Sequence, residues 1–397
     1  MIPVFYARCL EADYPEGHIQ AVRMFVRSLQ QLATRPEVFD FEYGRNDVSQ
    51  RNSSIRIRRF PFISTESANQ RTDPRTVAPL LFEAFSSLYF GTAEQSTFQG
   101  RRDVVVNLTN CFRYARLLDP RLHFPVVLHY YMREPSCKLL GNWLSQKADG
   151  FLVSSESVRQ YLTSECRVPQ KKIKIAYPPV DTSIYQPQNK SDVRQAFHIK
   201  RDSKIVLYMG SLKEGRFSIP TVLQALSETA RVIPSVMLLV AVPDRIEDRR
   251  RASLLVRAAA KSGLSDRIIL QIKNLDNEEK SALYALSDLF IYPASKRAVA
   301  TEPPLTVLES MACGTPILAC KEPSVEEIIV NPECGEIVSC DVTSLTRALV
   351  GLLSAEERLR TLSSNCRSVA LTNFSPRVSG TILLEWFAEI LNESRHG

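Results

Sequence analysis

The chain has 397 residues, which at roughly 100–200 residues per domain predicts two domains. A hydrophobic fraction of 44%, a charged fraction of 23% and only 14 glycines exclude collagen-like, low-complexity and largely disordered proteins. The formal net charge of +7 is too small an excess for a dedicated nucleic-acid-binding module, so we expect no nucleic-acid partner.

In the first half, strand-like runs alternate with helical patterns, as in βα units around a parallel sheet. The expected strands are residues 3–8, 54–60, 103–108, 124–131, 150–154 and 173–177. Residues 17–33 predict a helix packed on that sheet, because Val22, Phe25 and Leu29 follow the spacing of a buried helical face. Residues 1–180 are therefore the first expected domain.

A polar segment around residues 185–191 has no buried face, so residues 181–203 are expected to form an interdomain linker. A second α/β cycle over residues 204–374 predicts strands at 204–209, 236–242, 268–272, 289–293 and 315–320, with helices at 218–232, 246–262, 277–286 and 304–312. The end of the chain predicts three helices, and the last, within 375–397, is a candidate to cross back to the first domain.

Two basic clusters leave alternatives open. The first, Arg45, Arg51, Arg56, Arg58 and Arg59, fits a solvated edge strand, or a patch that meets a phosphorylated acceptor or an anionic membrane surface. The second lies between Arg245 and Arg251, where Glu247 and Asp248 partly offset it, and is expected to be a solvated helix face.

The nine cysteines are scattered and form no C-x-x-C pair, so we expect reduced, mostly buried thiols rather than a disulfide framework or a zinc site. No apolar run approaches the ~18–20 residues that cross a bilayer, and the start resembles no signal peptide. We expect a cytoplasmic protein, with peripheral attachment to the inner face of the membrane as an alternative.

Several catalytic motifs are absent from the sequence. No two glycines are separated by one residue, which excludes G-x-G-x-x-G and G-x-S-x-G, and no P-loop motif occurs. No aspartate has another two residues away, so the D-x-D device that holds a metal ion against a nucleotide sugar is missing. Dinucleotide-binding enzymes, P-loop enzymes, serine hydrolases and metal-dependent transferases are therefore disfavoured.

The most informative stretch is residues 293–317. A strand ends there, a loop carries the acid Glu302, and a helix opens at Pro304, a residue that suits the first helical position. The amides of Leu305, Thr306 and Val307 would then point out of a helix N-terminus at the carboxyl end of a parallel sheet, where an anion is favoured. Glu309 lies just over one turn further and can face hydroxyls of a bound ligand.

The run Leu-Glu-Ser-Met-Ala-Cys-Gly-Thr-Pro at 308–316 resembles the retaining GT-B glycosyltransferases of family 4, also called group 1. Residues 206–215 are similar to that family's strand and phosphate-binding loop, and residues 177–182 to its interdomain connection. The resemblance covers almost the entire chain. It implies an α/β fold of the GT-B class, in which two Rossmann-like doubly wound domains face each other across a cleft, with a C-terminal helical segment.

Two departures from the family pattern affect the expected site. The family has two glutamates separated by seven residues, but Thr301 stands at the first position and Glu302 comes one place later. Either Glu302 substitutes or that role is lost. Ser211 follows Gly210 where the family has Gly-Arg, so Lys213 and Arg216 are expected to supply the positive charge.

The resemblance implies the functional residues. His129, at the end of an apolar strand, would contact the transferred sugar near the reacting carbon, with Glu302 as the second catalytic residue. Glu309 would bind the donor ribose, and the region of Lys273 would hold the base. The expected donor-binding residues are Gly17, Lys213, Arg216, Lys273, Leu305, Thr306, Val307 and Glu309.

The expected activity is a hexosyltransferase-type, retaining glycosyltransferase that uses a UDP-, GDP- or ADP-sugar and needs no metal or other cofactor. Its acceptor would be lipid-linked, a polysaccharide or a small molecule. A catalytically degenerate scaffold for another transferase and a nucleotide-sugar 2-epimerase are the alternatives. The base, the sugar, the acceptor and the oligomeric state stay open.

Overall fold

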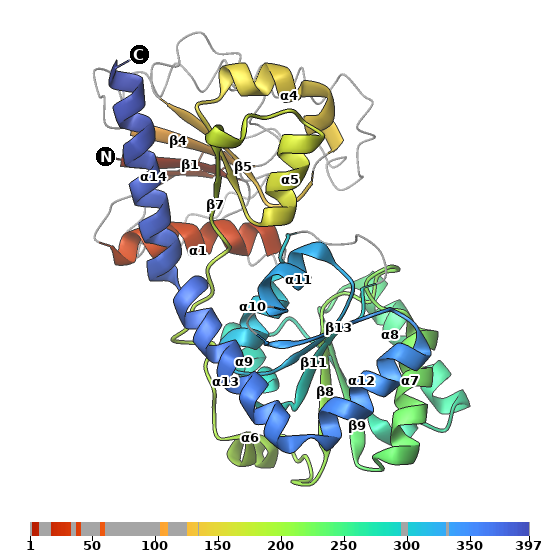
Figure 1. Cartoon of the computed structure of the whole chain (residues 1–397). Helices are drawn as coiled ribbons and strands as arrows, with labels where there is room; N and C mark the ends of the chain where they lie inside the picture. The colour runs from red at the N-terminus through yellow and green to blue at the C-terminus, as the bar shows by residue number, and fades with distance from the viewer. Residues whose placement is uncertain are drawn as a thin grey trace. The chain divides into compact units, whose positions relative to one another are not determined.

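The computed structural model describes residues 2–7, 17–32, 37–40, 56–59, 104–109, 125–133, 135–294, 301–330 and 333–396. The chain divides into two compact units. Unit 1 comprises Met1–Pro178 together with Pro376–Gly397, and unit 2 comprises Pro179–Ser375. Each unit is built around its own parallel sheet (Figure 1).

In unit 1, seven parallel strands lie in the order β3-β2-β1-β4-β5-β6-β7. The strands are β1 (Ile2–Ala7), β2 (Glu37–Asp40), β3 (Arg56–Arg59), β4 (Val104–Thr109), β5 (Val126–Tyr130), β6 (Gly150–Val153) and β7 (Ile173–Ile175). The arginine-rich strand β3 lies at one edge of the sheet, as one interpretation of the sequence expects. Arg45 and Arg51 of that basic cluster lie outside the described residues.

The described helices of unit 1 are α1 (Gly17–Gln31), α4 (Pro135–Lys147), α5 (Glu156–Ser164) and α14 (Pro376–His396). The apolar face predicted for α1 is confirmed, since Val22, Phe25 and Leu29 are buried. Helix α14 packs beside α1 (Figure 1). A Cβ atom at Gly380 of α14 would lie 3.0 Å from the carbonyl oxygen of Ser28, so glycine permits the two helices to approach closely.

In unit 2, six parallel strands lie in the order β10-β9-β8-β11-β12-β13. The strands are β8 (Lys204–Met209), β9 (Val236–Val242), β10 (Ile268–Ile272), β11 (Leu289–Tyr292), β12 (Ile317–Cys320) and β13 (Gly335–Val338). The chain first winds outward from β8 to β10 and then returns to the other side of β8. This reversal is the pattern of a doubly wound sheet.

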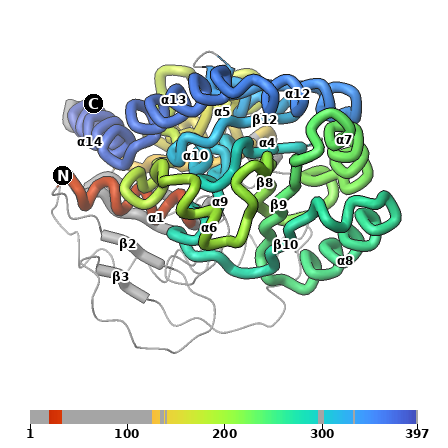
Figure 2. The backbone as a smooth tube through the Cα atoms, turned by 90° about the horizontal axis from the view of Figure 1, so that it is seen from below, coloured from red at the N-terminus to blue at the C-terminus, as the bar shows by residue number. Residues whose placement is uncertain are grey.

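The helices of unit 2 cover both faces of this sheet. They are α6 (Lys190–Ala196), α7 (Ile219–Val232), α8 (Ile246–Lys261), α9 (Asn277–Leu286), α10 (Leu305–Ala312), α11 (Pro323–Ile329), α12 (Val342–Ser354) and α13 (Glu356–Asn373). One large core joins α7, α8 and α12 to alternate residues of β8, β9 and β11, whereas α9 contacts β8 and α10 contacts β11 and β12. Figure 2 shows α7 beside β9 and α8 beside β10.

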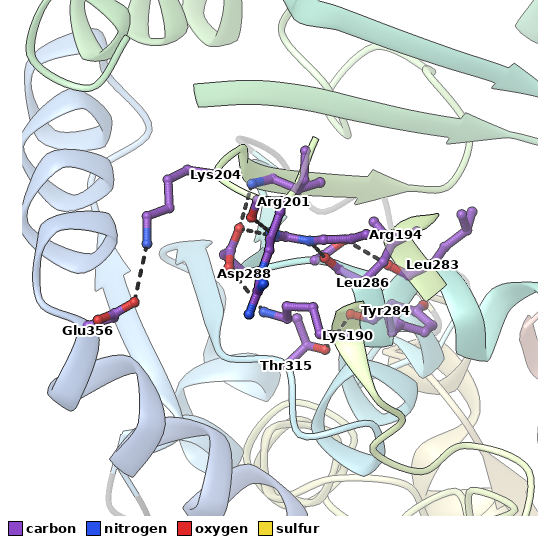
Figure 3. Close-up of polar contacts among 12 residues, drawn as sticks. Lys190, Arg194, Arg201, Lys204, Leu283, Tyr284, Leu286, Asp288, Thr315 and Glu356 are labelled. Atoms are coloured by element: carbon purple, nitrogen blue, oxygen red, sulfur yellow. Dashed lines mark hydrogen bonds and ion pairs between the residues drawn. The ribbon is translucent and has the colours of Figure 1, made fainter. Parts of the chain in front are cut away.

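Residues 181–203, expected to be an interdomain linker, lie within unit 2. Their helix α6 packs on α9, and Arg194 on α6 is buried. The Arg194 Nη2 donates to Asp288 Oδ2 at 2.7 Å, and the same oxygen accepts from the amide of Ile205 at 2.6 Å (Figure 3). The Lys190 Nζ donates to Asp288 Oδ1 at 3.0 Å. A buried ionic cluster, rather than an apolar face, therefore fixes this segment to the amino ends of β8 and β11.

None of the described helices is long and apolar enough to cross a membrane.

Candidate functional site

The strand order of unit 2 reverses between β8 and β11. In a doubly wound sheet, ligands bind outside the carboxyl ends of the strands at such a reversal. The chain leaves β8 at Gly210 and leaves β11 at Pro293. Residues 210–217 and 301–309 therefore hold the candidate site of this unit.

The side chains of Tyr208 and Asp248 fix the turn after β8. Gly210 has φ 145°, a backbone conformation that L side chains rarely adopt, which explains the glycine there. The Ser211 Oγ donates to Asp248 Oδ1 at 2.7 Å, and the Leu212 amide donates to the same oxygen at 2.9 Å. The Tyr208 hydroxyl donates to the Ser211 carbonyl oxygen at 2.6 Å. Three hydrogen bonds therefore fix the conformation of this turn.

Two basic residues follow on this turn. The Lys213 Nζ lies 3.9 Å from Glu247 Oε2, and its side chain is 39% exposed. The Arg216 amide donates to the Lys213 carbonyl oxygen at 3.0 Å. Burial raises the pKa of Tyr208 and of Tyr292, and the positive charge of Arg216 lowers both in part. Arg216 therefore lies near the carboxyl ends of both β8 and β11.

Glu302 lies near the carboxyl end of β11 as well. Its residue exposure is 1%, and that of Glu322, just after β12, is 5%. After burial, the negative charge of Glu322 and then that of Glu302 contribute to raising the pKa of Tyr292, the last residue of β11. Glu322 also caps α11, because its Oε2 accepts from the Ser324 amide at 3.0 Å. The charges of Glu322, Arg216 and Glu302 therefore all act on the hydroxyl of Tyr292.

Helix α10 begins at Leu305, and no side chain of the residues that the structure describes caps its first turn. The Val307 amide donates to the Pro304 carbonyl oxygen at 3.0 Å, so this expected anion donor is already engaged within the turn. This bond closes the first turn of the helix on the carbonyl group of Pro304. Leu305 and Thr306 are the amides left to the expected role, at the positive end of the helix dipole.

Glu309 is buried on α10, with 8% exposure. Its Oε2 accepts a hydrogen bond of 2.9 Å from the Tyr284 hydroxyl of α9. Burial raises the pKa of Tyr284 and of Tyr185, and the negative charge of Glu309 adds to both effects. Two phenols therefore stay protonated beside this carboxylate, and one of them orients it.

Lys273 follows β10, and its amide donates to the Val242 carbonyl oxygen at 3.0 Å. Its side chain turns to Glu279 in a short ion pair, and that hydrogen bond raises the pKa of Lys273. Glu279 belongs to the capping box of α9 together with Asp276. The Lys273 side chain therefore has a partner on the surface.

The two remaining candidates lie in unit 1. Gly17 is the first residue of α1, and His129 lies in β5 with 1% exposure. The His129 Nδ1 is 3.0 Å from the Tyr131 hydroxyl, and its ring packs at 5.3 Å against the edge of Phe25. Aromatic packing thus fixes the orientation of this imidazole.

Sequence reasoning missed several residues of the site. Asp248 was expected on a solvated basic face, but it is 0% exposed. The signal was present, because Asp248 shares the spacing of Ala252, Leu255 and Ala259, which form the buried face of α8. Tyr284 and Glu322 gave no signal of this kind, because their roles depend on neighbours distant in the sequence.

Within the described residues, no group of three or more His, Cys, Asp or Glu side chains is arranged to hold a metal ion.

Comparisons with known proteins agree with this geometry. Residues 189–369 match the family model described as glycosyl transferases group 1. The chain is 25% identical over 206 residues to a D-inositol 3-phosphate glycosyltransferase of Mycolicibacterium smegmatis, an alignment that covers 52% of this chain and 45% of the relative. The chain spans about half the length of the curated relatives it matches.

Solved structures extend the likeness to the whole chain. A glycosyltransferase from Rickettsia africae superposes with a TM-score of 0.75 and 15% identity, covering 98% of both chains. Anabaena HepE, solved in complex with UDP and glucose, superposes with a TM-score of 0.72 and 14% identity, covering 98% of this chain and 100% of HepE. The expected α/β fold of the GT-B class, with two Rossmann-like domains and a helical C-terminus, is confirmed.

Proposed function

Because residues 189–369 carry the sequence pattern of the group 1 glycosyltransferases, we propose that this protein is a glycosyltransferase that moves a sugar from a nucleoside diphosphate sugar to an acceptor hydroxyl with retention of configuration. One observation carries the proposal. Lys213, Arg216, Glu302 and the uncapped start of α10 all lie at the carboxyl ends of β8 and β11, where the strand order reverses.

The diphosphate is the leaving group of this reaction. As its bond to the sugar breaks, negative charge grows on the diphosphate, and positioned positive charge lowers the barrier. Lys213, Arg216 and the amides of Leu305 and Thr306 supply that charge. The proposed reaction accordingly needs no metal ion.

The carboxylates bind hydroxyl groups of the donor. Glu309, oriented by Tyr284, accepts from the ribose. Glu302 takes the role of the family's first glutamate and contacts the transferred sugar. The chain after β10, at Lys273, lies beside the base through its backbone, since the Lys273 side chain is paired with Glu279.

Two further roles that the family resemblance implies fall on residues of unit 1. His129 contacts the sugar near the reacting carbon, and Gly17 allows the donor phosphate or the acceptor to approach the start of α1. The acceptor is a hydroxyl of a lipid-linked sugar, a polysaccharide or a small molecule. Relatives named for an inositol phosphate and for L-malate favour a small polar acceptor.

Slow hydrolysis of the donor tests the reaction without knowledge of the acceptor. The protein is incubated with UDP-, GDP- and ADP-glucose, with and without EDTA, and the released sugar is followed by ¹H NMR before it mutarotates. We expect α-glucose to appear first from one α-linked donor, in the presence of EDTA as well.

Glu302→Gln is expected to slow this release while the donor still binds, and Glu357→Gln, on the exposed first turn of α13, serves as the control. First appearance of β-glucose would contradict retention. Release that stops with EDTA would contradict metal independence.

A further inference from the structure

Asp248 is a fully buried carboxylate in the first turn of α8, with 0% exposure. Its Oδ1 accepts two hydrogen bonds, from Ser211 Oγ at 2.7 Å and from the Leu212 amide at 2.9 Å. Its Oδ2 is buried and has no hydrogen-bond partner among the described residues. A buried polar oxygen without a hydrogen-bond partner costs free energy in a protein interior, so an acidic side chain at this position needs an explanation.

Packing alone does not explain it. Ala252, Leu255 and Ala259 fill the same face of α8 with apolar side chains, and an apolar residue at position 248 would avoid the cost of burying an unpaired polar oxygen. What Asp248 adds is a pair of bonds to two consecutive residues of the turn after β8. With the Tyr208 bond to the Ser211 carbonyl oxygen, these contacts fix both sides of one peptide.

This peptide lies directly before the two cations of the site. Lys213 is the next residue after Leu212, and the Arg216 amide bonds back to the Lys213 carbonyl oxygen at 3.0 Å. Ser211 is 5% exposed and its hydroxyl is given to Asp248, so its side chain is turned away from any ligand. The turn therefore offers positive charge through Lys213 and Arg216, and the direction of these side chains depends on the backbone that Asp248 holds.

We propose that Asp248 is a positioning residue for the diphosphate of the donor. Through Ser211 Oγ and the Leu212 amide it fixes the turn that presents Lys213 and Arg216, so that each additional phosphate of the ligand gains from that alignment. This inference rests on the proposed function, because it needs a phosphorylated ligand at the turn. It adds a residue that acts from beneath the site without contacting the ligand.

The test compares nucleotides that differ by one phosphate. Dissociation constants of the preferred nucleoside diphosphate and of its monophosphate are measured by calorimetry on the full chain. We expect Asp248→Ala to weaken the diphosphate about tenfold or more and the monophosphate by less, so that the ratio of the two constants falls. That ratio is the decisive readout, because a merely structural role would change both constants alike.

Two further variants separate the causes. Asp248→Asn keeps an oxygen that accepts from Ser211 and Leu212, so we expect it to restore the ratio to within about threefold of the unmodified protein. Asp244→Asn, on a half-buried acid just before α8 that pairs with Arg249, is the matched control and should leave the ratio unchanged. If Asp248→Ala does not fold, Ser211→Ala carries the test, with a smaller fall expected in the same direction.

Failure of the proposed function and failure of the positioning role of Asp248 give different results. If the unmodified protein binds no nucleoside diphosphate, the proposed function fails, and with it the ligand on which this inference rests. If the unmodified protein binds but Asp248→Ala, or Ser211→Ala in its place, keeps the diphosphate-to-monophosphate ratio, only the positioning role of Asp248 is overturned. An Asp248→Asn variant as poor as Asp248→Ala would also overturn it, because the accepting oxygen is then not what matters.

Discussion

Substitutions of Lys213 and of its partner Glu247 are expected to change the affinity for a nucleoside diphosphate in opposite directions. A charge-assisted hydrogen bond to a phosphate is worth about 1.5–3 kcal/mol. Lys213 must give up its present partner, because its Nζ lies 3.9 Å from Glu247 Oε2. At that separation the attraction is about 1 kcal/mol in water, the upper end of the range for exposed pairs. The net contribution of Lys213 to diphosphate binding is therefore about 0.5–2 kcal/mol.

Lys213→Ala should accordingly raise the dissociation constant of the preferred nucleoside diphosphate about 2- to 30-fold. Glu247→Gln removes the competing carboxylate, and we expect it to tighten binding about two- to fivefold. Calorimetry at low and at high salt measures both effects, and each should shrink as salt screens the charges. Arg250→Ala, an exposed arginine on α8, is the control of equal charge change.

Two results would contradict this role of Lys213: Lys213→Ala binds the diphosphate as tightly as the unmodified protein, or Glu247→Gln binds it more weakly. Either result would mean that the Lys213 ammonium does not reach the diphosphate from this turn.

Other predictions concern stability and thiol chemistry. Asp288→Ala should lower the free energy of unfolding of unit 2 by about 3–5 kcal/mol in urea titrations, because it strands a buried guanidinium, whereas Lys204→Ala, which breaks a pair at 3.9 Å, should cost under about 1 kcal/mol. In peptide mapping at pH 8, iodoacetamide should label Cys340, whose pKa is lowered by a hydrogen bond from Cys320, well before Cys313, whose pKa burial raises to about 12; the reverse order would contradict these environments. The hydrogen bonds from Ser344 lower the pKa of Asp341 below its ordinary value of 3.8, so Asp341→Ala should lower Tm at pH 7. This difference should shrink as the pH falls from about 5 and should be lost only below the lowered folded-state pKa. A difference as large at pH 2 as at pH 7 would contradict it.

The apolar pattern predicts most elements of both sheets. Helix α1 was expected over residues 17–33 and spans Gly17–Gln31, and β8 and β9 have the expected bounds. The strands β2 and β13 were missed, because each carries only two consecutive apolar residues, and the residues of β13 are only half-buried. Apolar periodicity predicts an element only when burial of apolar side chains is what holds it.

Helix α6 illustrates the opposite case. Its sequence is polar, and its one buried residue is Arg194, which bonds to Asp288, Leu286 and Arg201. Because the partners lie up to 94 positions away, no local pattern reveals them. A polar segment was therefore interpreted as a linker where the fold uses a buried ionic contact.

The candidate site also has features that the sequence predicts and features that it does not. The start of α10 follows from Pro304, and the turn after β8 from Gly210, because both depend on local backbone geometry. The partner of Glu309 and the burial of Asp248 were not predicted, since they arise where helices from separate parts of the chain meet the sheet. Local chemistry predicts where a ligand site opens, and tertiary packing decides which side chains support it.

The central claim is that unit 2 binds a nucleoside diphosphate without a metal ion. The most direct measurement is the thermal stability of the purified protein with UDP, GDP and ADP, each with and without EDTA. A ligand at 100 times its dissociation constant stabilises the native state by about 2.7 kcal/mol, so a shift of several degrees is expected from one nucleotide, with EDTA present. No shift with any of the three would contradict the donor site, and a shift abolished by EDTA would contradict its metal independence.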